Sequence, residues 1–361
     1  MTKESDRRWP RIVSLAAAVP PHRIAQDEAL GFFQRSFDVP PTQRDRLQEV
    51  FLNAAIETRY AAAPIRWYDR AHSFEQKNNL YIDKAVGLLK QVAVDALAGA
   101  GLACSDVDML VTVSSTGIAV PTLDARLMEE LPFRRNVQRL PLFGLGCAGG
   151  ALGLARAAAC ASAQPGSRIL YLVVELCTLT FCRSDQTTAN IVATALFGDG
   201  AAGAVLTTDG PGPAIRAWGE HTWPGSLDVM GWSVTQAGLE VQLSRGIPDI
   251  ARRRVRPVTD EFLASVGLDL ADVDDFICHP GGARVLDALE DAFGLPAGGL
   301  AVSRGILRDY GNMSAATVLF VLRRVLETPA ADNGQRGEVR RYLMTGLGPG
   351  FSMGFLVLES A

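Results

Sequence analysis

The sequence predicts an α/β protein of five layers, built from two copies of one strand–helix unit. Glycine, proline and alanine punctuate the chain, and short β-rich runs alternate with longer helical runs between them. Two patterns recur at nearly the same offset. Asp106-Val107-Asp108 returns as Asp272-Val273-Asp274 after 166 residues, and Gly146-Cys147 is echoed by Gly311-Asn312 after 165 residues. With 361 residues, 48% of them hydrophobic, the chain can bury the core that such a fold needs.

The predicted elements follow in order along the chain. Apolar runs at 107–115, 169–174 and 204–208 are typical of buried strands. Longer stretches at 84–102 and 148–163 predict helices, the first of them stopped by Gly-Leu at 101 and 102. The strongest turn signal between the echoed halves is Pro-Gly-Pro at 211–213. We therefore expect an N-terminal half of residues 1–212 and a C-terminal half of residues 213–361.

Composition excludes several classes of protein. The formal charge is −4 and the charged side chains are interspersed, so we expect neither a nucleic-acid partner nor a polybasic membrane anchor. No run reaches the roughly 18 apolar residues of a membrane span. Arg7-Arg8 before the apolar run 12–19 loosely mimics a twin-arginine signal, but prolines follow that short run in place of a small-residue cleavage site. These features predict a cytoplasmic protein.

Cysteine and histidine usage predicts neither a disulfide framework nor a metal centre. The six cysteines form no CxxC pair and lie mostly in apolar surroundings, which is typical of reduced core thiols. The four histidines are scattered, and no helical histidine pair or Cys/His cluster stands among them.

Cys147 lies in the most informative local pattern, the glycine-rich turn 143–150 before an alanine-rich helical stretch. Backbone N–H groups and the dipole at a helix N-terminus favour a thiolate, the reactive form of cysteine, and the glycines let a substrate approach. Two other interpretations are a packed core thiol and a dinucleotide site, because residues 144–149 match GxGxxG. The dinucleotide match is weak, since the first acidic residue after it is Glu175, inside an apolar run.

His279 and Asn312 supply the groups that a nucleophilic cysteine needs. Each lies beside glycine at the end of an apolar run. Alone, the histidine also fits a structural role and the asparagine fits a helix cap. With Cys147 they form a nucleophile, a base and an amide donor. The echo places Cys147 and Asn312 at equivalent helix starts, and His279 at the end of a strand in the second half, so the set predicts catalysis.

Five motifs resemble, in the same order, those of the type III polyketide synthases, the chalcone-synthase-like enzymes of the thiolase superfamily. The resemblance covers nearly the whole chain and implies a thiolase-like five-layered αβαβα fold. It also implies that Cys147 is the acyl-accepting nucleophile and that His279 and Asn312 decarboxylate malonyl-CoA. The motifs are Gly146-Cys147-Ala148-Gly149-Gly150, Ala195-Leu196-Phe197-Gly198-Asp199-Gly200-Ala201-Ala202, His279-Pro280-Gly281-Gly282, Gly311-Asn312-Met313-Ser314 and Gly346-Leu347-Gly348-Pro349-Gly350.

The implied reaction uses acyl-CoA and malonyl-CoA as substrates and needs no cofactor. An imidazolium at His279 would hold Cys147 as a thiolate, which accepts the acyl group. Donors from His279 and Asn312 would stabilise the enolate formed when malonyl-CoA loses carbon dioxide. Repeated attack of such enolates on the Cys147 thioester grows a polyketide that can cyclise in the same cavity. The family also implies a homodimer, with Val120-Pro121 where a neighbouring subunit reaches the partner's cavity.

The resemblance places further residues at the substrate cavity. Phe197 is either a core aromatic or, as the family implies, a gatekeeper between the coenzyme A tunnel and the cavity. The other cavity positions are Ser115, Thr180, Trp232, Val241, Gly282 and Ser314.

Two of these positions depart from the plant enzymes, which carry glycine and a second gatekeeper phenylalanine where this chain has Trp232 and Val241. The smaller side chain of Val241 therefore opens one wall of the cavity, and the larger side chain of Trp232 closes another. Met230-Gly231-Trp232 with Gly238-Leu239 is similar to bacterial members that take fatty acyl starters and make alkylpyrones or alkylresorcinols.

The coenzyme A phosphate site also departs from the plant pattern. Glu49 and Glu57 stand in the stretch where plant enzymes carry lysine and arginine. Arg44, Arg46 and Arg59 are the nearby substitutes.

Two rival functions stay open. A ketoacyl synthase III-like enzyme makes one condensation on an acyl-carrier protein with the same triad, although residues 346–350 and the longer chain favour the polyketide side. A non-catalytic thiolase-fold subunit would serve only dimerisation or partner binding, and the intact catalytic residues argue against it.

Overall fold

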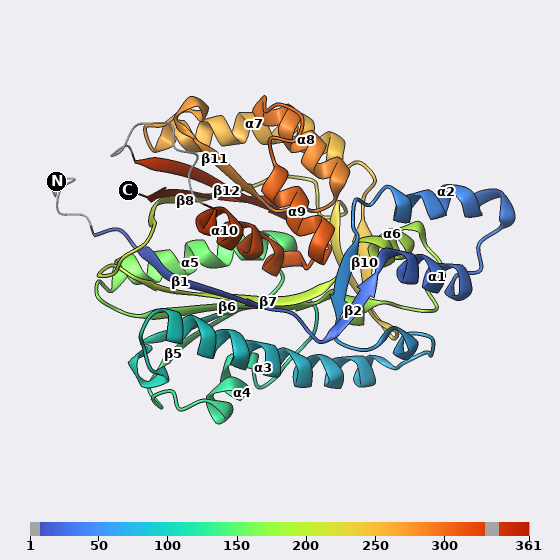
Figure 1. The fold of residues 1–361 in the computed structure, drawn as a ribbon, viewed down its shortest axis with the longest axis horizontal. Coiled ribbons are helices and arrows are strands. Elements are labelled where there is room, and N and C mark those ends of the chain that lie inside the picture. The colour runs from blue at the N-terminus through green and yellow to red at the C-terminus, as the bar shows by residue number, and fades with distance from the viewer. Residues whose placement is uncertain (1–7, 329–338, 361) are drawn as a thin grey trace.

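The structure is a computed structural model that describes residues 8–328 and 339–360. Figure 1 shows five layers: α3 and α4 on one outer face, a sheet, α5 and α10 in the middle, a second sheet, and α7 and α8 on the other outer face. The five-layered fold predicted from the sequence is confirmed. The helices of these layers, with α9 beside α8, are α3 (Phe74–Gly99), α4 (Leu123–Glu130), α5 (Gly149–Ala163), α7 (Ile247–Ser265), α8 (Ala283–Phe293), α9 (Ala301–Tyr310) and α10 (Thr317–Glu327).

Two copies of one unit form the sheet layers. The strands lie in the order β11-β12-β13-β8-β1-β7-β6-β4-β5. Both copies contain a parallel pair, β4 with β6 and β11 with β12, followed by two antiparallel pairings. The first copy has a further strand, β5, parallel to β4 at the edge. The copies join where Arg11 pairs with Ala214. The strands are β1 (Arg11–Ala18), β4 (Met109–Val113), β5 (Gln138–Leu142), β6 (Ile169–Leu176), β7 (Asp199–Thr207), β8 (Ala214–Thr222), β11 (Asp275–Cys278), β12 (Arg340–Gly348) and β13 (Ser352–Ser360).

The first echoed motif marks the same turn in both copies. A carboxylate oxygen of Asp106 accepts the backbone N–H of Ala103 at 2.8 Å, and one of Asp272 accepts that of Asp269 at 2.9 Å. Each aspartate closes a short 3-10 turn just before β4 or β11. The echo is therefore structural, because it caps the entry to equivalent strands.

The first predicted helix, 84–102, is correct in type and wrong at its start. α3 begins ten residues earlier because Ser73 and Gln76 form a capping box. The Gln76 N–H donates to Ser73 Oγ at 3.2 Å, and the Ser73 N–H donates to Gln76 Oε1 at 3.1 Å. The signal Ser-x-x-Gln was present in the sequence. At the other end, Gly101 has φ +67, which fits the predicted stop.

Small residues bring the two middle-layer helix starts together. A Cβ added to Gly150, at the start of α5, would lie 2.2 Å from the carbonyl oxygen of Ala315. Ala315 belongs to the 3-10 turn η7 (Ser314–Ala316), which leads into α10. Backbone therefore packs on backbone at this point, and the N-termini of α5 and α10 approach each other.

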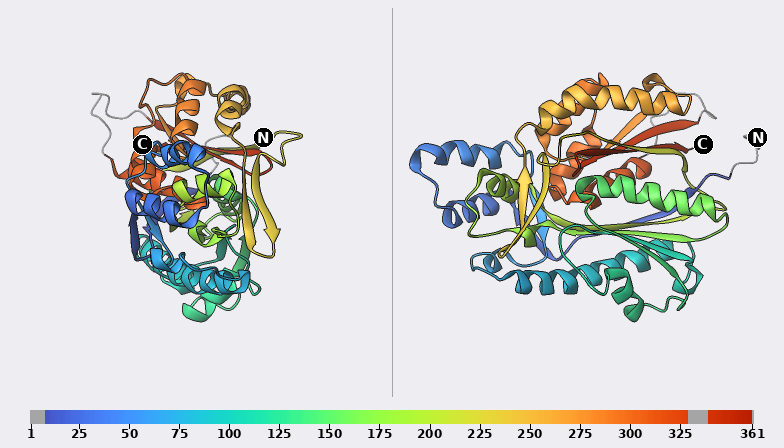
Figure 2. Two further views of the ribbon diagram at one scale, coloured as in Figure 1. Left: turned by 90° about the vertical axis from the view of Figure 1, so that its right-hand side faces the viewer. Right: turned by 180° about the vertical axis from the view of Figure 1, so that it is seen from behind.

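The remaining elements gather at one end of the layers, as the views in Figure 2 show. In the described part of the chain, no helix is long and apolar enough to span a membrane. These end elements are β2 (His22–Ala25), α1 (Gln26–Ser36), α2 (Pro41–Leu52), β3 (Thr58–Ala61), α6 (Thr188–Leu196), β9 (Met230–Thr235) and β10 (Gly238–Leu243).

Candidate active site

Cys147 lies in the 3-10 turn η4 (Gly146–Ala148), directly before α5, so its thiol stands at a helix N-terminus as the sequence predicts. Gly146 has φ +47, and a Cβ there would lie 2.6 Å from Cδ of Pro349. Only glycine fits this position without displacing the loop after β12.

Ser115 supports this turn instead of lining the cavity. Its Oγ accepts the backbone N–H of Gly144 at 3.3 Å and that of Gly146 at 3.2 Å. The side chain is buried beneath the turn. The sequence comparison placed Ser115 beside the substrate, whereas in the structure it holds the loop that carries Cys147.

His279 directly follows β11, and its backbone continues the pairing with β12 by donating to the Thr345 carbonyl at 2.9 Å. The ring is buried, and within the described residues neither Nδ1 nor Nε2 has a hydrogen-bond partner. A buried unpartnered imidazole is costly. The ring is therefore available to a group that enters the site.

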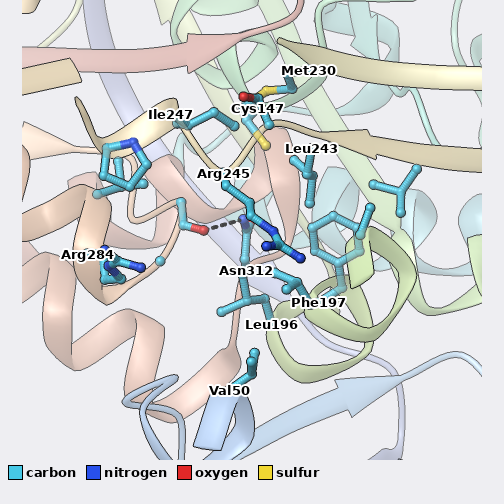
Figure 3. A pocket seen from close by; sticks show the side chains of 18 of the residues that line it. Val50, Cys147, Leu196, Phe197, Met230, Leu243, Arg245, Ile247, Arg284 and Asn312 are labelled. Carbon is cyan, nitrogen blue, oxygen red and sulfur yellow. Dashed lines mark hydrogen bonds between the residues drawn. The ribbon is translucent and has the colours of Figure 1, made fainter. Parts of the chain in front are cut away.

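Asn312 has a fixed carboxamide. Its Nδ2 donates to the Gly281 carbonyl at 3.1 Å, the bond drawn in Figure 3, and its Oδ1 accepts the Ser314 N–H at 2.8 Å. The helix-start equivalence predicted for Cys147 and Asn312 is off by three residues. By the starts of η4 and η7, the counterpart of Cys147 is Ala315, and Asn312 lies just before the turn.

The buried setting favours neutral forms of the cysteine and the histidine. Burial raises the pKa of the Cys147 thiol to about 11; a hydrogen bond to Ser314 Oγ at 3.6 Å opposes this rise, and nearby Glu175 adds to it. Burial lowers the pKa of His279 to about 4. The pair of thiolate and imidazolium expected from the sequence is therefore disfavoured.

Glu175 is a buried carboxyl group that does not line the cavity but affects Cys147, and the sequence did not predict this effect. Its Oε2 accepts the Ser115 N–H at 3.0 Å and the Thr116 hydroxyl at 2.8 Å. Burial raises its pKa to about 8, although these hydrogen bonds favour the carboxylate. An acidic residue within an apolar strand was the available signal.

One cavity of about 490 Å³ joins most of the predicted site residues. In Figure 3, Cys147, Asn312 and Phe197 border it together, although they come from both halves of the chain. The predicted residues that line it are Cys147, Phe197, Trp232, Val241, His279, Gly282, Asn312 and Ser314.

Phe197 separates this cavity from a smaller one of about 60 Å³. Thr180, predicted to line the substrate cavity, borders the smaller space instead, and its Oγ1 donates to the Cys177 carbonyl at 2.7 Å. The Phe197 ring meets Trp232 edge-on, with centroids 6.2 Å apart, and Trp232 pairs with Val241 across the β9–β10 hairpin.

Exposed arginines surround the cavity mouth. Arg46, one of the three predicted substitutes for phosphate binding, lines the cavity; Arg44 does not. Arg59 is buried and donates to backbone carbonyls, so it cannot reach a phosphate at the mouth. Arg245 and Arg284 also line the cavity, from the end of β10 and the start of α8, and no sequence motif singled them out.

The described residues contain no group of three or more His, Cys, Asp or Glu side chains that could hold a metal ion. All six cysteines are free thiols.

Comparison with known protein families defines the class of enzyme. The family model for the N-terminal domain of chalcone and stilbene synthases matches residues 3–211, and the model for their C-terminal domain matches residues 217–361. The chain therefore belongs to the chalcone and stilbene synthase family, the type III polyketide synthases. Members of this class are malonyl-CoA-dependent condensing enzymes, so the rival ketoacyl synthase III-like function is not favoured.

Three bacterial proteins show the sequence similarity in detail. A 1,3,6,8-tetrahydroxynaphthalene synthase of Streptomyces peucetius subsp. caesius is 38% identical over 98% of this chain and 93% of its own length. A 3,5-dihydroxyphenylacetyl-CoA synthase of Streptomyces toyocaensis is 33% identical over 94% and 87%. An α-pyrone-synthesis polyketide synthase-like protein of Mycobacterium tuberculosis is 27% identical over 96% and 89%.

The fold is similar to that of a solved relative. The crystal structure of 1,3,6,8-tetrahydroxynaphthalene synthase from Streptomyces coelicolor A3(2) has a TM-score of 0.90 at 29% identity, and the match covers 97% of this chain and all of that one. The predicted family, fold class and enzyme class are confirmed.

Proposed function

We propose that this type III polyketide synthase loads a long-chain fatty acyl-CoA onto Cys147, extends it with malonyl-CoA, and closes the product to an alkylpyrone or alkylresorcinol. The observation that carries the proposal is the single cavity in which Cys147, His279 and Asn312 meet. In this scheme coenzyme A thioesters are substrates, and no cofactor takes part.

Loading begins from the neutral pair. His279 accepts the Cys147 proton as sulfur attacks the thioester, because burial holds the thiol pKa high until a substrate arrives. The unpartnered His279 ring supports this role. The product is an acyl group on sulfur and free coenzyme A.

Extension uses the Asn312 amide and the same histidine. The Asn312 NH₂ group has two hydrogens, of which Gly281 takes one, so the second can donate to the malonyl thioester oxygen. Since Oδ1 is held by the Ser314 N–H, the amide cannot flip. The amide and His279 then stabilise the enolate formed when carbon dioxide leaves.

A fatty acyl starter is supported by the apolar space around Phe197. The cavity next to Cys147 has Leu196, Leu243 and Val241 in its wall, and the smaller space beyond Phe197 is bordered by Ile24 and Phe32 among others. Apolar walls favour an alkyl chain. The name of the Mycobacterium tuberculosis relative supports an α-pyrone product, whereas other relatives are named for aromatic products.

Arg46, Arg245 and Arg284 are proposed to bind the coenzyme A phosphates. They are exposed at the mouth of the cavity, on α2, in the turn after β10 and on α8. Guanidinium groups bind phosphate oxygens in bidentate fashion. Glu49 also borders the mouth. A change of its charge would therefore test whether this surface binds phosphates.

A homodimer in the cytoplasm completes the proposal. Val120 is 87% exposed and Phe143 is 61% exposed, with Ile118 close in sequence at 41%. Large exposed apolar side chains of this kind mark a surface for a partner. We expect a second copy of the chain to cover them.

Product analysis tests the proposed reaction. Purified protein is given malonyl-CoA with acyl-CoA starters of increasing chain length, and the products are identified by mass spectrometry. Alkylpyrones or alkylresorcinols with fatty acyl starters support the proposal; aromatic products from malonyl-CoA alone would reject the fatty starter. A parallel reaction with carrier-bound malonate separates a single condensation from repeated extension.

The intact acyl-enzyme tests the nucleophile. Cys147→Ala should show no acyl adduct by mass spectrometry, whereas Cys160→Ala should keep it. Cys160 is a matched control, because it is also a free thiol on α5 yet does not line the cavity. An adduct on Cys147→Ala would reject the assigned nucleophile.

A further inference from the structure

Arg59 is a buried cation in an unusual setting. It lies in β3 and is only 2% exposed, and no carboxylate of residues 8–328 or 339–360 pairs with its guanidinium. Burial lowers its pKa to about 10, which leaves it charged at neutral pH. Buried charges are otherwise paired, so this one needs a reason to be retained.

The two terminal nitrogens of the guanidinium donate instead to oxygens, most of them at the end of α6, whereas the buried Nε has no hydrogen-bond partner within the described residues. Nη1 donates to the carbonyls of Thr194 at 2.7 Å and Phe197 at 3.2 Å, and Nη2 donates to that of Ala195 at 2.8 Å. Nη2 also donates to Oε1 of Gln26. The last carbonyls of a helix lack partners within the helix, and the negative end of its dipole favours a cation.

Phe197 is joined directly to Asn312. The two residues form an isolated parallel bridge, in which the Asn312 N–H donates to the Leu196 carbonyl at 2.8 Å and the Gly198 N–H donates to the Asn312 carbonyl at 3.0 Å. A Cβ on Gly198 would lie 2.4 Å from the Tyr310 carbonyl oxygen and 3.3 Å from Cβ of Arg59. Arg59 therefore packs against the point where the two halves of the chain meet.

We propose that Arg59 is a positioning residue that fixes the Phe197 backbone, and through the bridge the Asn312 amide, relative to Cys147. The planar fork holds three carbonyls at once, which a single ammonium cannot reproduce in the same geometry. This inference rests on the role proposed above for Asn312. Cys147 is held by different elements, through Ser115 and Pro349, so its position does not depend on Arg59.

Arg59→Lys tests the inference by separating decarboxylation from thiol reactivity. We expect the kcat for carbon dioxide release from malonyl-CoA to fall about tenfold or more, because small misplacements of a catalytic group have large effects on rate. The KM for malonyl-CoA and the rate of Cys147 alkylation by iodoacetamide should stay within about twofold of the parent.

Two further variants keep the test decisive. Gln26→Ala removes one acceptor and leaves Arg59 in place, so it should lower the same kcat by a smaller factor even if Arg59→Lys folds poorly. Arg134→Lys is the matched control, since Arg134 also donates to a backbone carbonyl, that of Val107 at 2.9 Å, and lies outside the cavity. It should leave the kcat unchanged.

Several outcomes would overturn the inference. Parent-like decarboxylation by both Arg59→Lys and Gln26→Ala would do so. So would losses of decarboxylation, alkylation and thermal midpoint that run in parallel, because these indicate a structural role alone. Asn312→Ala separates failure of the proposed function from failure of the inference about Arg59. If Asn312→Ala decarboxylates malonyl-CoA normally, the proposed function fails. If it is inactive and Arg59→Lys is normal, only the inference fails.

Discussion

The two copies of the unit present the same turn to the cavity with different chemistry. Gly146 in the first copy and Ser314 in the second both have φ +47, and each begins the 3-10 turn before a middle-layer helix. The N–H of Gly146 is held by Ser115 Oγ at 3.2 Å, and that of Ser314 is held by Asn312 Oδ1 at 2.8 Å. Duplication has preserved the turn, and the side chain that holds it has changed.

This difference assigns the chemistry of each half. In the first copy the positive-φ position has no side chain, because Pro349 occupies the space, and the next residue, Cys147, faces the cavity. In the second copy the Ser314 side chain stands there and meets Cys147 Sγ at 3.6 Å. The group that holds the second turn is itself the amide of Asn312. Its NH₂ is thereby directed to Gly281 and the cavity.

Changing the amide should have the largest effect. Asn312→Ala removes the proposed donor to the enolate, and we expect carbon dioxide release from malonyl-CoA to fall about 10²–10³-fold. Asn312→Asp keeps an oxygen for the Ser314 N–H and loses the donor, so it should be similarly slow. Alkylation of Cys147 should persist in both variants, because the first turn is held independently. Rapid decarboxylation by Asn312→Asp would contradict this division between the copies.

The pH dependence of Cys147 reactivity distinguishes a neutral pair of Cys147 and His279 from a pair of thiolate and imidazolium. The thiolate is the form that iodoacetamide attacks, and a pKa of about 11 leaves little of it at neutral pH. The alkylation rate of the free enzyme should therefore rise about tenfold per pH unit between pH 7 and 9, because the thiolate fraction does so below the pKa. A rate that is already level across this range would mean that a standing ion pair exists.

Gly146→Ala should break the first turn. The new Cβ would be placed at positive φ and 2.6 Å from the Pro349 ring. Backbone strain and overpacking together predict a loss of about 2–4 kcal/mol in the free energy of unfolding. Urea denaturation measures this loss. Gly101→Ala is the control for positive φ alone, because no atom lies within 4 Å of a Cβ there, and it should cost less. Equal losses would remove the role assigned to Pro349.

The sequence predicted the repeated fold because strand entry and helix entry each carry a short local signal. Asp106 and Asp272 cap equivalent turns, and a glycine motif, Gly146-Cys147 or Gly311-Asn312, precedes each middle helix. The register within the second turn could not be predicted. A non-glycine residue, Ser314, takes the left-handed conformation there, so the residue types do not align.

The sequence predicted the cavity residues whose chemistry identifies them. It did not predict the residues whose role depends on tertiary packing. Trp232 and Val241 were both placed at the cavity, and the structure pairs them across one hairpin. Ser115 follows β4, and Arg59 lies in β3. Both side chains are buried and form hydrogen bonds with backbone groups of other elements. Proximity in sequence cannot show this, because the carbonyls that accept from Arg59 are more than 100 residues away.

Ser314 provides the smallest and most selective test of the two turns. Ser314→Gly relieves backbone strain at φ +47 but adds freedom to the unfolded chain, so the free energy of unfolding should change by less than about 1 kcal/mol. The Ser314 hydroxyl lowers the pKa of Cys147, and its loss should slow alkylation at pH 8 by a few-fold. Ser314→Ala keeps the strain and also loses the hydroxyl. The two variants should therefore share the slower alkylation and differ in urea denaturation, with glycine the more stable if strain outweighs chain entropy. Faster alkylation in either variant would mean that the second copy does not tune the nucleophile of the first.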